Sequence, residues 1–203
     1  SEKNTGGVLV FDLPDLPVKN GARCRVYNNK IINNNIKNFG PKGTTVSEIA
    51  AGTGVVIMAT NQCEVFGNEI KGHNSVSLAV VSYLALQKPY KDTIYDPYVG
   101  GVSVHDNQFE RGTGALDNSV LFGQMFAAIF GDKVPDIIFD GSVNPSYKNA
   151  DGSIKEDQKI CFHNNGNVTY TNIDLEHKSA NMSTDISKMD CTIPALKEVK
   201  IMQ

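Results

Sequence analysis

The sequence predicts an all-β fold in which similar strand units stack on one another, and three observations lead to this prediction. A segment of eight residues occurs three times, an asparagine occupies the same position in every copy, and short runs of β-branched residues surround the copies. With 203 residues, of which 40% are hydrophobic, the chain is long enough to bury a substantial core.

The recurring segment spans residues 24–31, 63–70 and 102–109. Its copies share residue types at three positions: Val26, Val65 and Val104; Asn29, Asn68 and Asn107; Ile31, Ile70 and Phe109. The alternation along each copy is typical of a strand with one buried face, so the first residue of each copy is expected to point inward with the valine.

The shared asparagines are expected to mark a tight corner. A residue at such a corner must tolerate positive φ, and an asparagine amide can also bond neighbouring backbone. Stacking of the copies places Asn29, Asn68 and Asn107 in one ladder.

A second set of strands accompanies the copies, at 7–11, 54–58 and 76–81. Each unit then consists of a strand, a corner, a second strand, the asparagine turn and a short third strand. Every strand pairs in parallel with its equivalents in the neighbouring units, which is the arrangement of a right-handed parallel β-helix, or solenoid. Insertions at about 36–52 and 83–101 interrupt it. The alternative is an ordinary β-sandwich, which does not need the same asparagine at the same offset.

Residues 115–131 are predicted to form one inserted α-helix, with Asp117 or Asn118 as N-cap and Gly131 as C-cap. Its apolar side chains form two adjacent rows: Leu121, Met125 and Ile129, and Phe122, Phe126 and Phe130. We expect this stripe to pack on the β-helix as a lid or flank. A partner-protein interface and a membrane-surface contact are the alternatives.

The pattern divides the chain into β-helix units with long corner loops at 1–110, a helix-containing insertion at 111–158, and a last unit with a C-terminal cap segment at 159–203. Within the insertion, residues 135–143 are a candidate strand. The first strand begins at Gly6 or Gly7 with nothing before it to cap the open end, so we expect upstream β-helix coils or another chain to cover that end.

Four cysteines include no CxxC pair and no cysteine–histidine cluster at zinc-ligand spacing, so no structural metal site is expected. A disulfide between Cys161 and Cys191 is an option, and it would close a loop of about 30 residues and contribute roughly 3 kcal/mol. Cys24 and Cys63 are interpreted as small buried thiols, because both point inward at equivalent positions; a disulfide is the alternative.

The charge pattern argues against a nucleic-acid partner. The net charge is -3, and the 19 basic and 22 acidic residues are interspersed rather than clustered. No stretch reaches the roughly 18 consecutive apolar residues of a membrane span.

Stretches spread over nearly the whole chain carry a family resemblance: 4–14, 38–43, 51–54, 79–83, 95–98 and 190–196. With these residues the chain resembles a family of exported bacterial parallel β-helix repeat proteins, whose biochemical activity is not established. The resemblance implies further coils at the N-terminus and a signal peptide or lipoprotein anchor. It also implies a periplasmic, outer-membrane-associated or extracellular location, and pairing with a c-type cytochrome protein. Similarity to pectin-lyase-like solenoids is one of fold and carries no function across.

Two long loops, 11–23 and 83–101, are predicted to flank the short turn 59–62 and to leave a groove above it. The side chains expected to line this groove are aromatic, acidic or basic: Asp12, Asp15, Lys19, Tyr83, Lys88, Tyr90, Lys91, Asp92, Tyr95, Asp96 and Tyr98. Tyrosine rings stack on the apolar faces of sugars while charged groups bond the hydroxyls, so a glycan suits such a groove. The interpretation that the sequence favours, however, is that the tyrosines attach the loop to the scaffold.

The sequence favours an extracytoplasmic scaffold that binds a partner protein or a glycan through its corner loops and helix, because no nucleophile, base and orienting residue can be assembled from it. The alternative is a polysaccharide lyase or epimerase acting on uronates, with these candidate residues: Lys88, Lys91, Asp92, Asp96, His105, Asp106 and Arg111. No cofactor is expected. Calcium is a weaker option, since the carboxylates lack the spacing of a calcium-binding repeat.

Overall fold

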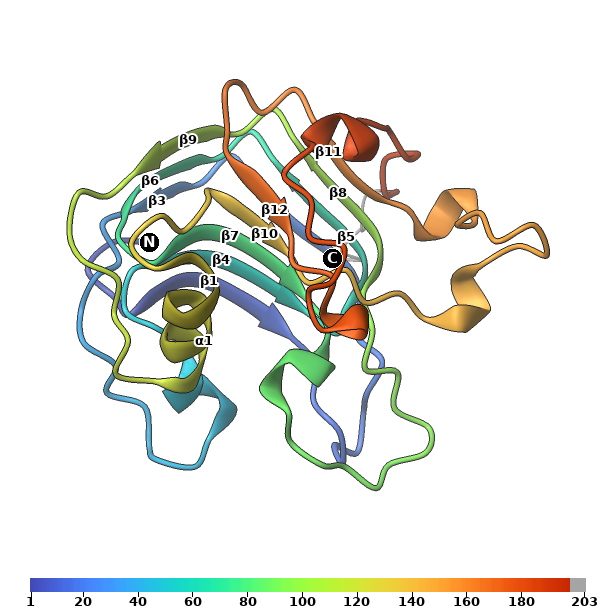
Figure 1. The fold of residues 1–203 in the computed structure, drawn as a ribbon, viewed down its shortest axis with the longest axis horizontal. Coiled ribbons are helices and arrows are strands. Elements are labelled where there is room, and N and C mark those ends of the chain that lie inside the picture. The colour runs from blue at the N-terminus through green and yellow to red at the C-terminus, as the bar shows by residue number, and fades with distance from the viewer. Residues whose placement is uncertain (198–203) are drawn as a thin grey trace, which may run out of the picture.

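The computed structural model describes residues 1–197 and consists mainly of parallel strands in three sheets (Figure 1). The first sheet has the strand order β1 (Gly6–Phe11), β4 (Thr53–Met58), β7 (Val76–Val81), β10 (Ile137–Phe139) and β12 (Tyr170–Asn172). The second has the order β11 (Ile160–His163), β8 (Gly100–His105), β5 (Asn61–Phe66) and β2 (Ala22–Tyr27). The third has the order β3 (Lys30–Ile32), β6 (Glu69–His73) and β9 (Gln108–Arg111). The end of the predicted cap segment, 198–203, lies outside the described residues.

The repeated segments lie in register in the second sheet. Cys24 pairs with Cys63, and Cys63 pairs with Val102 in the next strand. Val26 and Val65 are aligned two residues further on. All pairings between these strands are parallel. The prediction of an all-β fold with parallel strands and one α-helix is therefore confirmed.

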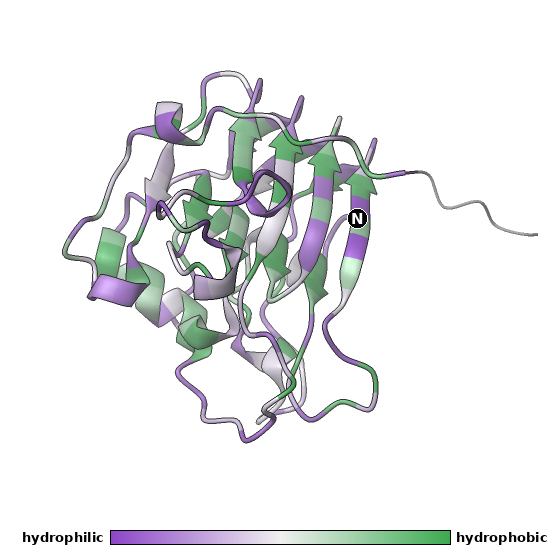
Figure 2. Ribbon diagram, turned by 90° about the vertical axis from the view of Figure 1, so that its right-hand side faces the viewer, coloured by the Kyte–Doolittle hydropathy of each residue, from purple (hydrophilic) through white to green (hydrophobic). Residues whose placement is uncertain are grey.

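The chain passes from the first sheet to the second and then to the third three times, in β1–β3, β4–β6 and β7–β9. We call each of these sets a strand triplet. Side chains from all three sheets meet in one interior cluster that includes the fully buried Ile57, Val65 and Ile70. Figure 2 shows apolar residues concentrated along the strands. Burial of one such side chain contributes about 1.5–3 kcal/mol, so the shared apolar interior is the main source of cohesion between triplets.

The predicted asparagines form a ladder at the corner after the second strand of each triplet. Asn29 Nδ2 donates a hydrogen bond to Asn68 Oδ1 at 3.0 Å, and Asn68 Nδ2 donates to Asn107 Oδ1 at 2.8 Å. Asn165 continues the ladder by accepting from Asn107 Nδ2 at 3.0 Å. Because the side-chain amides of Asn68, Asn107 and Asn165 also donate to a backbone carbonyl of the preceding triplet, the ladder fixes the register of the corner.

The left-handed residue at this corner is the one before each ladder asparagine, so the expectation of positive φ at the asparagine itself is wrong. Asn28, Gly67 and Asp106 have φ angles of 54°, 63° and 55°. The chain turns at this residue, and the side-chain amide of the following asparagine therefore points toward the asparagine of the neighbouring triplet. A Cβ on Gly67 would lie 2.5 Å from Asn28 Oδ1, which explains the glycine in the second triplet.

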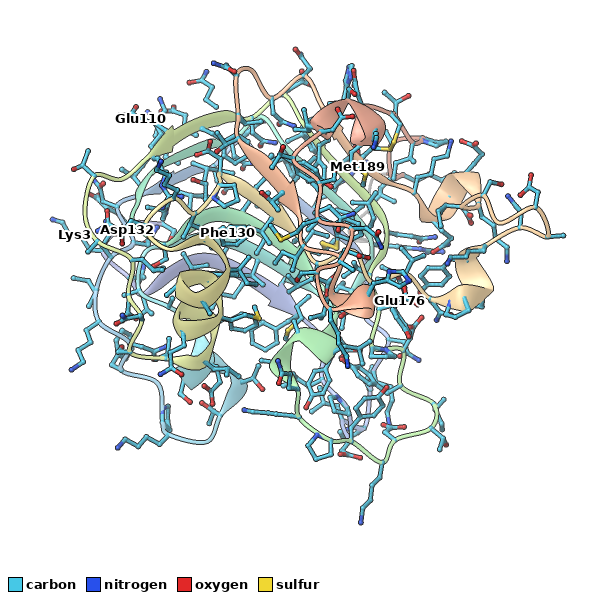
Figure 3. The ribbon with its side chains drawn as sticks, viewed as in Figure 1. Lys3, Glu110, Phe130, Asp132, Glu176 and Met189 are labelled. Atoms are coloured by element: carbon cyan, nitrogen blue, oxygen red, sulfur yellow. A yellow bond between two sulfur atoms is a disulfide. The ribbon has the colours of Figure 1, made fainter. Side chains whose placement is uncertain are left out.

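The middle strands of the first sheet, β4, β7 and β10, are buried on both faces. Their inward side chains join the interior cluster, and outward ones such as Val56 pack against Phe122 and Phe126 of helix α1 (Leu121–Phe130). Figure 1 shows α1 lying over this sheet, and Phe130, labelled in Figure 3, is partly buried in the same outer cluster. The apolar stripe of the helix is therefore used for packing on the strands, as expected.

The helix begins at Leu121, later than the predicted start at residue 115, and Gly131 ends it with a φ of 59°. Asp117 does not cap it. Instead, the Asp117 carboxylate accepts a hydrogen bond from the backbone amide of Ala51 at 2.8 Å, which ties the segment before the helix to the chain just ahead of β4.

Strand β10 falls inside the segment 111–158 that was predicted as an insertion, and it pairs with β7 on one side and β12 on the other. That segment therefore leaves the sheets after β9 and rejoins the first sheet before β11. Short 3-10 helices occupy several connections: Thr45–Glu48, Tyr83–Leu86, Pro145–Tyr147, Glu156–Gln158, Leu175–His177 and Ile186–Met189. Between residues 1 and 197, no helix has the length and apolar character needed to cross a membrane.

Two disulfides join the four cysteines. Cys161 of β11 is bonded to Cys191, which was an option from the sequence. Cys24 is bonded to Cys63, so the interpretation of these two as buried thiols is wrong. Their equivalent positions in adjacent paired strands bring the Cα atoms to 4.6 Å, a separation that a disulfide bridges.

Candidate functional site

The two loops that were predicted to flank a groove contact each other directly. Lys19 forms an ion pair with Asp92, and Asp92 Oδ2 also accepts from the backbone amide of Asp15 at 3.1 Å. The hydrogen bond from Lys19 is the main reason that the pKa of Asp92 lies below its ordinary value. The backbone amide of Asp96 donates to Asn20 Oδ1 at 2.8 Å. These contacts bridge the space in which a ligand was expected.

Three tyrosines of the second loop pack on one another and on the scaffold. The rings of Tyr83, Tyr90 and Tyr95 meet edge to face, with centroids 5.6 Å apart. Tyr83 and Tyr95 are buried in the outer cluster, and the Tyr95 hydroxyl donates to the backbone carbonyl of Asp12 at 3.0 Å. Burial raises the pKa of Tyr95 above its ordinary value. The tyrosines therefore attach the loop to the scaffold, which is the interpretation that the sequence favours over ligand contact.

The acidic residues of the predicted groove are also engaged within the protein. Asp96 accepts hydrogen bonds from the Tyr147 hydroxyl, from Asn144 Nδ2 at 3.1 Å and from the Tyr98 backbone amide at 3.1 Å. The Asp12 side chain is buried and accepts from the backbone amide of Gly21 at 3.2 Å.

The lysines of that loop differ in their surroundings. Lys88 forms an ion pair with Glu48 at 3.3 Å, which links the second loop to the segment before β4. Lys91 is exposed. The structure thus gathers most of the predicted groove residues, but in contacts that hold loops together.

The outward face of the second sheet carries a line of charged side chains. Arg25 Nε lies 3.0 Å from Glu64 Oε2, and Glu64 Oε1 lies 3.5 Å from His105 Nε2. The three residues come from the neighbouring strands β2, β5 and β8, so the line crosses the strands. Their side chains are 22%, 8% and 24% exposed, so Arg25 and His105 are partly accessible to a ligand, whereas Glu64 is buried between them and supports them.

A row of stacked rings follows the same three strands. The ring centroids of Tyr27 and Phe66 lie 5.1 Å apart with planes inclined by 5°, and those of Phe66 and His105 lie 5.2 Å apart with planes inclined by 4°. The rings cover one another's faces, so they present their edges outward. This stacking fixes the orientation of the His105 imidazole.

His105 lies between two carboxylates. Its Nδ1 bonds Asp106 Oδ2 at 2.7 Å, and its Nε2 faces Glu64. Asn164 Nδ2 donates to the other oxygen of Asp106. The bond from His105, followed by that from Asn164, lowers the pKa of Asp106. A histidine oriented in this way offers ring nitrogens for hydrogen bonds to a ligand.

Sequence reasoning names His105 and Asp106 as options but misses Arg25 and Glu64. The sequence does contain a feature that could have identified them. Arg25 and Glu64 each follow the inward-pointing first residue of a repeated segment by one position, and they therefore point outward. Arg111, another residue considered for catalysis, donates to the backbone carbonyl of Asn74 at 3.0 Å and to that of Val134, so it has a structural role.

Within residues 1–197, no three histidine, cysteine, aspartate or glutamate side chains are arranged to hold a metal ion. No protein-family model matches the chain, and neither a curated protein nor a solved structure matches it. The resemblance noted from the sequence therefore stays a prediction.

Proposed function

We propose that this chain is a non-catalytic scaffold that binds a glycan outside the cytoplasm, across the outward face of the second sheet. The observation that carries the proposal is the line of Arg25, Glu64 and His105 on three adjacent strands, held in place by the Arg25–Glu64 ion pair and by ring stacking.

A glycan suits this surface for two reasons. The in-register side chains of Tyr27, Phe66 and His105 follow one another at the strand spacing of about 4.8 Å, so a ligand made of repeating units can meet a ring at each step. Charged and imidazole groups form hydrogen bonds with hydroxyls, and Tyr27, 50% exposed at the end of the row of rings, offers an apolar contact. Because these groups are already ordered, little conformational entropy is lost on binding.

In this proposal the strand triplets are coils of a right-handed parallel β-helix, and the segment after β11 is its C-terminal cap. The asparagine ladder and the shared interior cluster support that reading. We assign a right-handed coil because connections between parallel strands of one sheet are right-handed almost without exception. Such a coil stack gives the binding face the stiffness that a regular ligand requires.

The disulfides support a location outside the cytoplasm. All four cysteines are paired, and such bonds persist in oxidising compartments. The family resemblance points the same way, to a periplasmic, outer-membrane-associated or extracellular location.

The lyase or epimerase alternative has less support in this geometry. Lys88, Asp92 and Asp96 form contacts within the loops, whereas abstraction of a proton from a uronate needs a base that faces the substrate. Binding without catalysis is the function that the site favours.

The test is a binding survey of the purified chain against neutral and acidic oligosaccharides, followed by calorimetry on those that bind. We expect Arg25→Ala and His105→Ala each to weaken binding about ten-fold, which corresponds to about 1.4 kcal/mol. Lys30→Ala is the matched control, because Lys30 is an exposed charge of the third sheet, 3.6 Å from Glu69. Absence of binding to every oligosaccharide, or binding that neither substitution changes, would contradict the proposal.

A further inference from the structure

A cavity lies beside the line of charged residues, beneath the C-terminal segment. Residues 193–197 enclose it together with Arg23, Gln62, Gly101 and Asp157, and its volume is about 630 Å³. This volume falls in the range of sites for small ligands. Arg23 and Gln62 precede Arg25 and Glu64 by two positions on the same strands, so the cavity adjoins the proposed glycan surface.

The floor of the cavity is a column of three residues with left-handed backbone. Arg23, Gln62 and Gly101 have φ angles of 66°, 54° and 64°, and the strand pairing skips all three, so the same irregularity occurs in β2, β5 and β8. For a residue other than glycine this conformation costs on the order of 1 kcal/mol. Arg23 and Gln62 occupy equivalent positions in β2 and β5. Each keeps a long polar side chain at a position where glycine would avoid the backbone strain.

The roof of the cavity is tethered to the sheet at one end. Cys191 is bonded to Cys161 of β11, and His163 Nδ1 bonds Asp190 Oδ1 at 2.7 Å. Met189, labelled in Figure 3, packs against the interior cluster just before this tether. The segment after Cys191 is therefore held at its start and passes over the floor column.

The lining combines two cations, Arg23 and Lys197, with polar groups and apolar side chains. Arg23 forms no ion pair within the part of the chain that the structure describes. Gln62 and Asp157 supply an amide and a carboxylate, while Ile193 and Leu196 supply apolar surface. A guanidinium without a partner binds carboxylates and sulfates through paired hydrogen bonds.

We infer that this cavity is a subsite for one acidic sugar unit, bearing a carboxylate or a sulfate ester, of the glycan bound along the second sheet. The inference rests on the proposed function and further specifies that the bound glycan carries negative charge. Arg23 pairs with the acidic group, Gln62 and Asp157 bond hydroxyls, and the apolar side chains of the tethered segment contact the sugar ring.

The first experiment measures the affinities of tetragalacturonate, a sulfated galactan tetrasaccharide and cellotetraose by calorimetry. We expect at least one acidic tetrasaccharide to bind about ten-fold more tightly than cellotetraose. Arg23→Gly removes the guanidinium and suits the left-handed backbone, so the variant folds and loses that preference. Lys30→Ala on the third sheet is the charge-removal control and keeps the preference.

The second experiment ends the chain after Cys191, which keeps both disulfides and removes the roof. The shortened chain should bind the acidic tetrasaccharide about ten-fold more weakly, and the full chain should show slower deuterium exchange at 192–197 when that ligand is added. Unchanged affinity in both Arg23→Gly and the shortened chain, with binding still weakened by His105→Ala, overturns the subsite and leaves the proposed function standing. Failure of all three tetrasaccharides and of the wider survey overturns both.

Discussion

The hydroxyl group of Tyr95 donates a hydrogen bond at 3.0 Å to the backbone carbonyl of Asp12, which lies 83 positions earlier in the chain. This bond joins the two corner loops at the place where the sequence predicted an open groove. It is buried, and it adds to the ion pair between Lys19 and Asp92 at the outer part of the same loops.

We expect Tyr95→Phe to lower the free energy of unfolding by about 1–2 kcal/mol, because the Asp12 carbonyl loses its partner in a buried position. Tyr27→Phe is the matched control: that tyrosine is 50% exposed, and its change should stay within about 0.5 kcal/mol. Urea denaturation followed by circular dichroism measures both. Similar losses in the two variants would show that the Tyr95 bond does not fasten the loops.

The asparagine ladder predicts an effect that depends on position. The Asn68 side chain donates to Asn107 and to the carbonyls of Val26 and Phe66, and it accepts from Asn29. Asn68→Ala should cost on the order of 3 kcal/mol, since several buried groups lose partners at once. Asn29→Ala, at the exposed end of the ladder, should cost about 1 kcal/mol. Equal costs in denaturant titrations would argue against a cooperative ladder.

His73 predicts a loss of stability in acid. It is fully buried, its Nε2 lies 3.2 Å from Asn34 Nδ2, and burial lowers its pKa from 6.5 to about 4. A lowered pKa in the folded state stabilises the fold above the unfolded pKa, and this contribution of about 3 kcal/mol is lost as the pH falls from 6.5 through 4.

Asn34 occupies the position equivalent to His73, 39 residues earlier. His73→Asn therefore places the same residue type at both positions and removes the titrating group. Denaturation at pH 7, 5 and 4 should therefore show a shallower acid-induced loss for the variant than for the unaltered chain. Parallel curves would mean that His73 titrates at its ordinary pKa.

Asp140 predicts the opposite dependence on pH. Its carboxyl group is buried and accepts hydrogen bonds from the amide and hydroxyl of Ser82 at 2.7 and 2.6 Å and from the amide of Ser142 at 3.0 Å. Burial outweighs these bonds and raises its pKa from 3.8 to about 6. The raised pKa stabilises the fold below pH 3.8, and this contribution, on the order of 3 kcal/mol, is lost as the pH rises through 6.

Asp140→Asn should thus destabilise the protein more at pH 4 than at pH 7, because only the unaltered chain gains from a proton at this site. Denaturation at the two pH values measures the difference. A penalty that is the same at both would show that the Asp140 carboxyl keeps its ordinary pKa.

The repeated segments made most of the fold predictable. Inward alternation at Val26 and Val65 sets the strand faces, and the constant offset of the asparagines sets the register. The same alternation placed Cys24 and Cys63 side by side, yet the bond between them was only the alternative interpretation, because inward-pointing neighbours indicate burial without specifying the distance between the two sulfur atoms.

The candidate site was harder to predict because it depends on contacts between distant residues. The pairing of Lys19 with Asp92 joins loops 73 positions apart, and nothing in either loop specifies its partner. Arg25 and Glu64 were overlooked for a different reason: a single outward residue in one strand is uninformative until its neighbours across the sheet are known.

The strand order of the sheets has a consequence for how the molecule opens. Within the described residues, each of the strands β4 to β8 has a strand on both sides, whereas β1 and β2 have a strand on one side. Backbone amides in the strands between residues 53 and 105 should therefore exchange with deuterium more slowly than those of β1 and β2, since their release requires two ladders to separate.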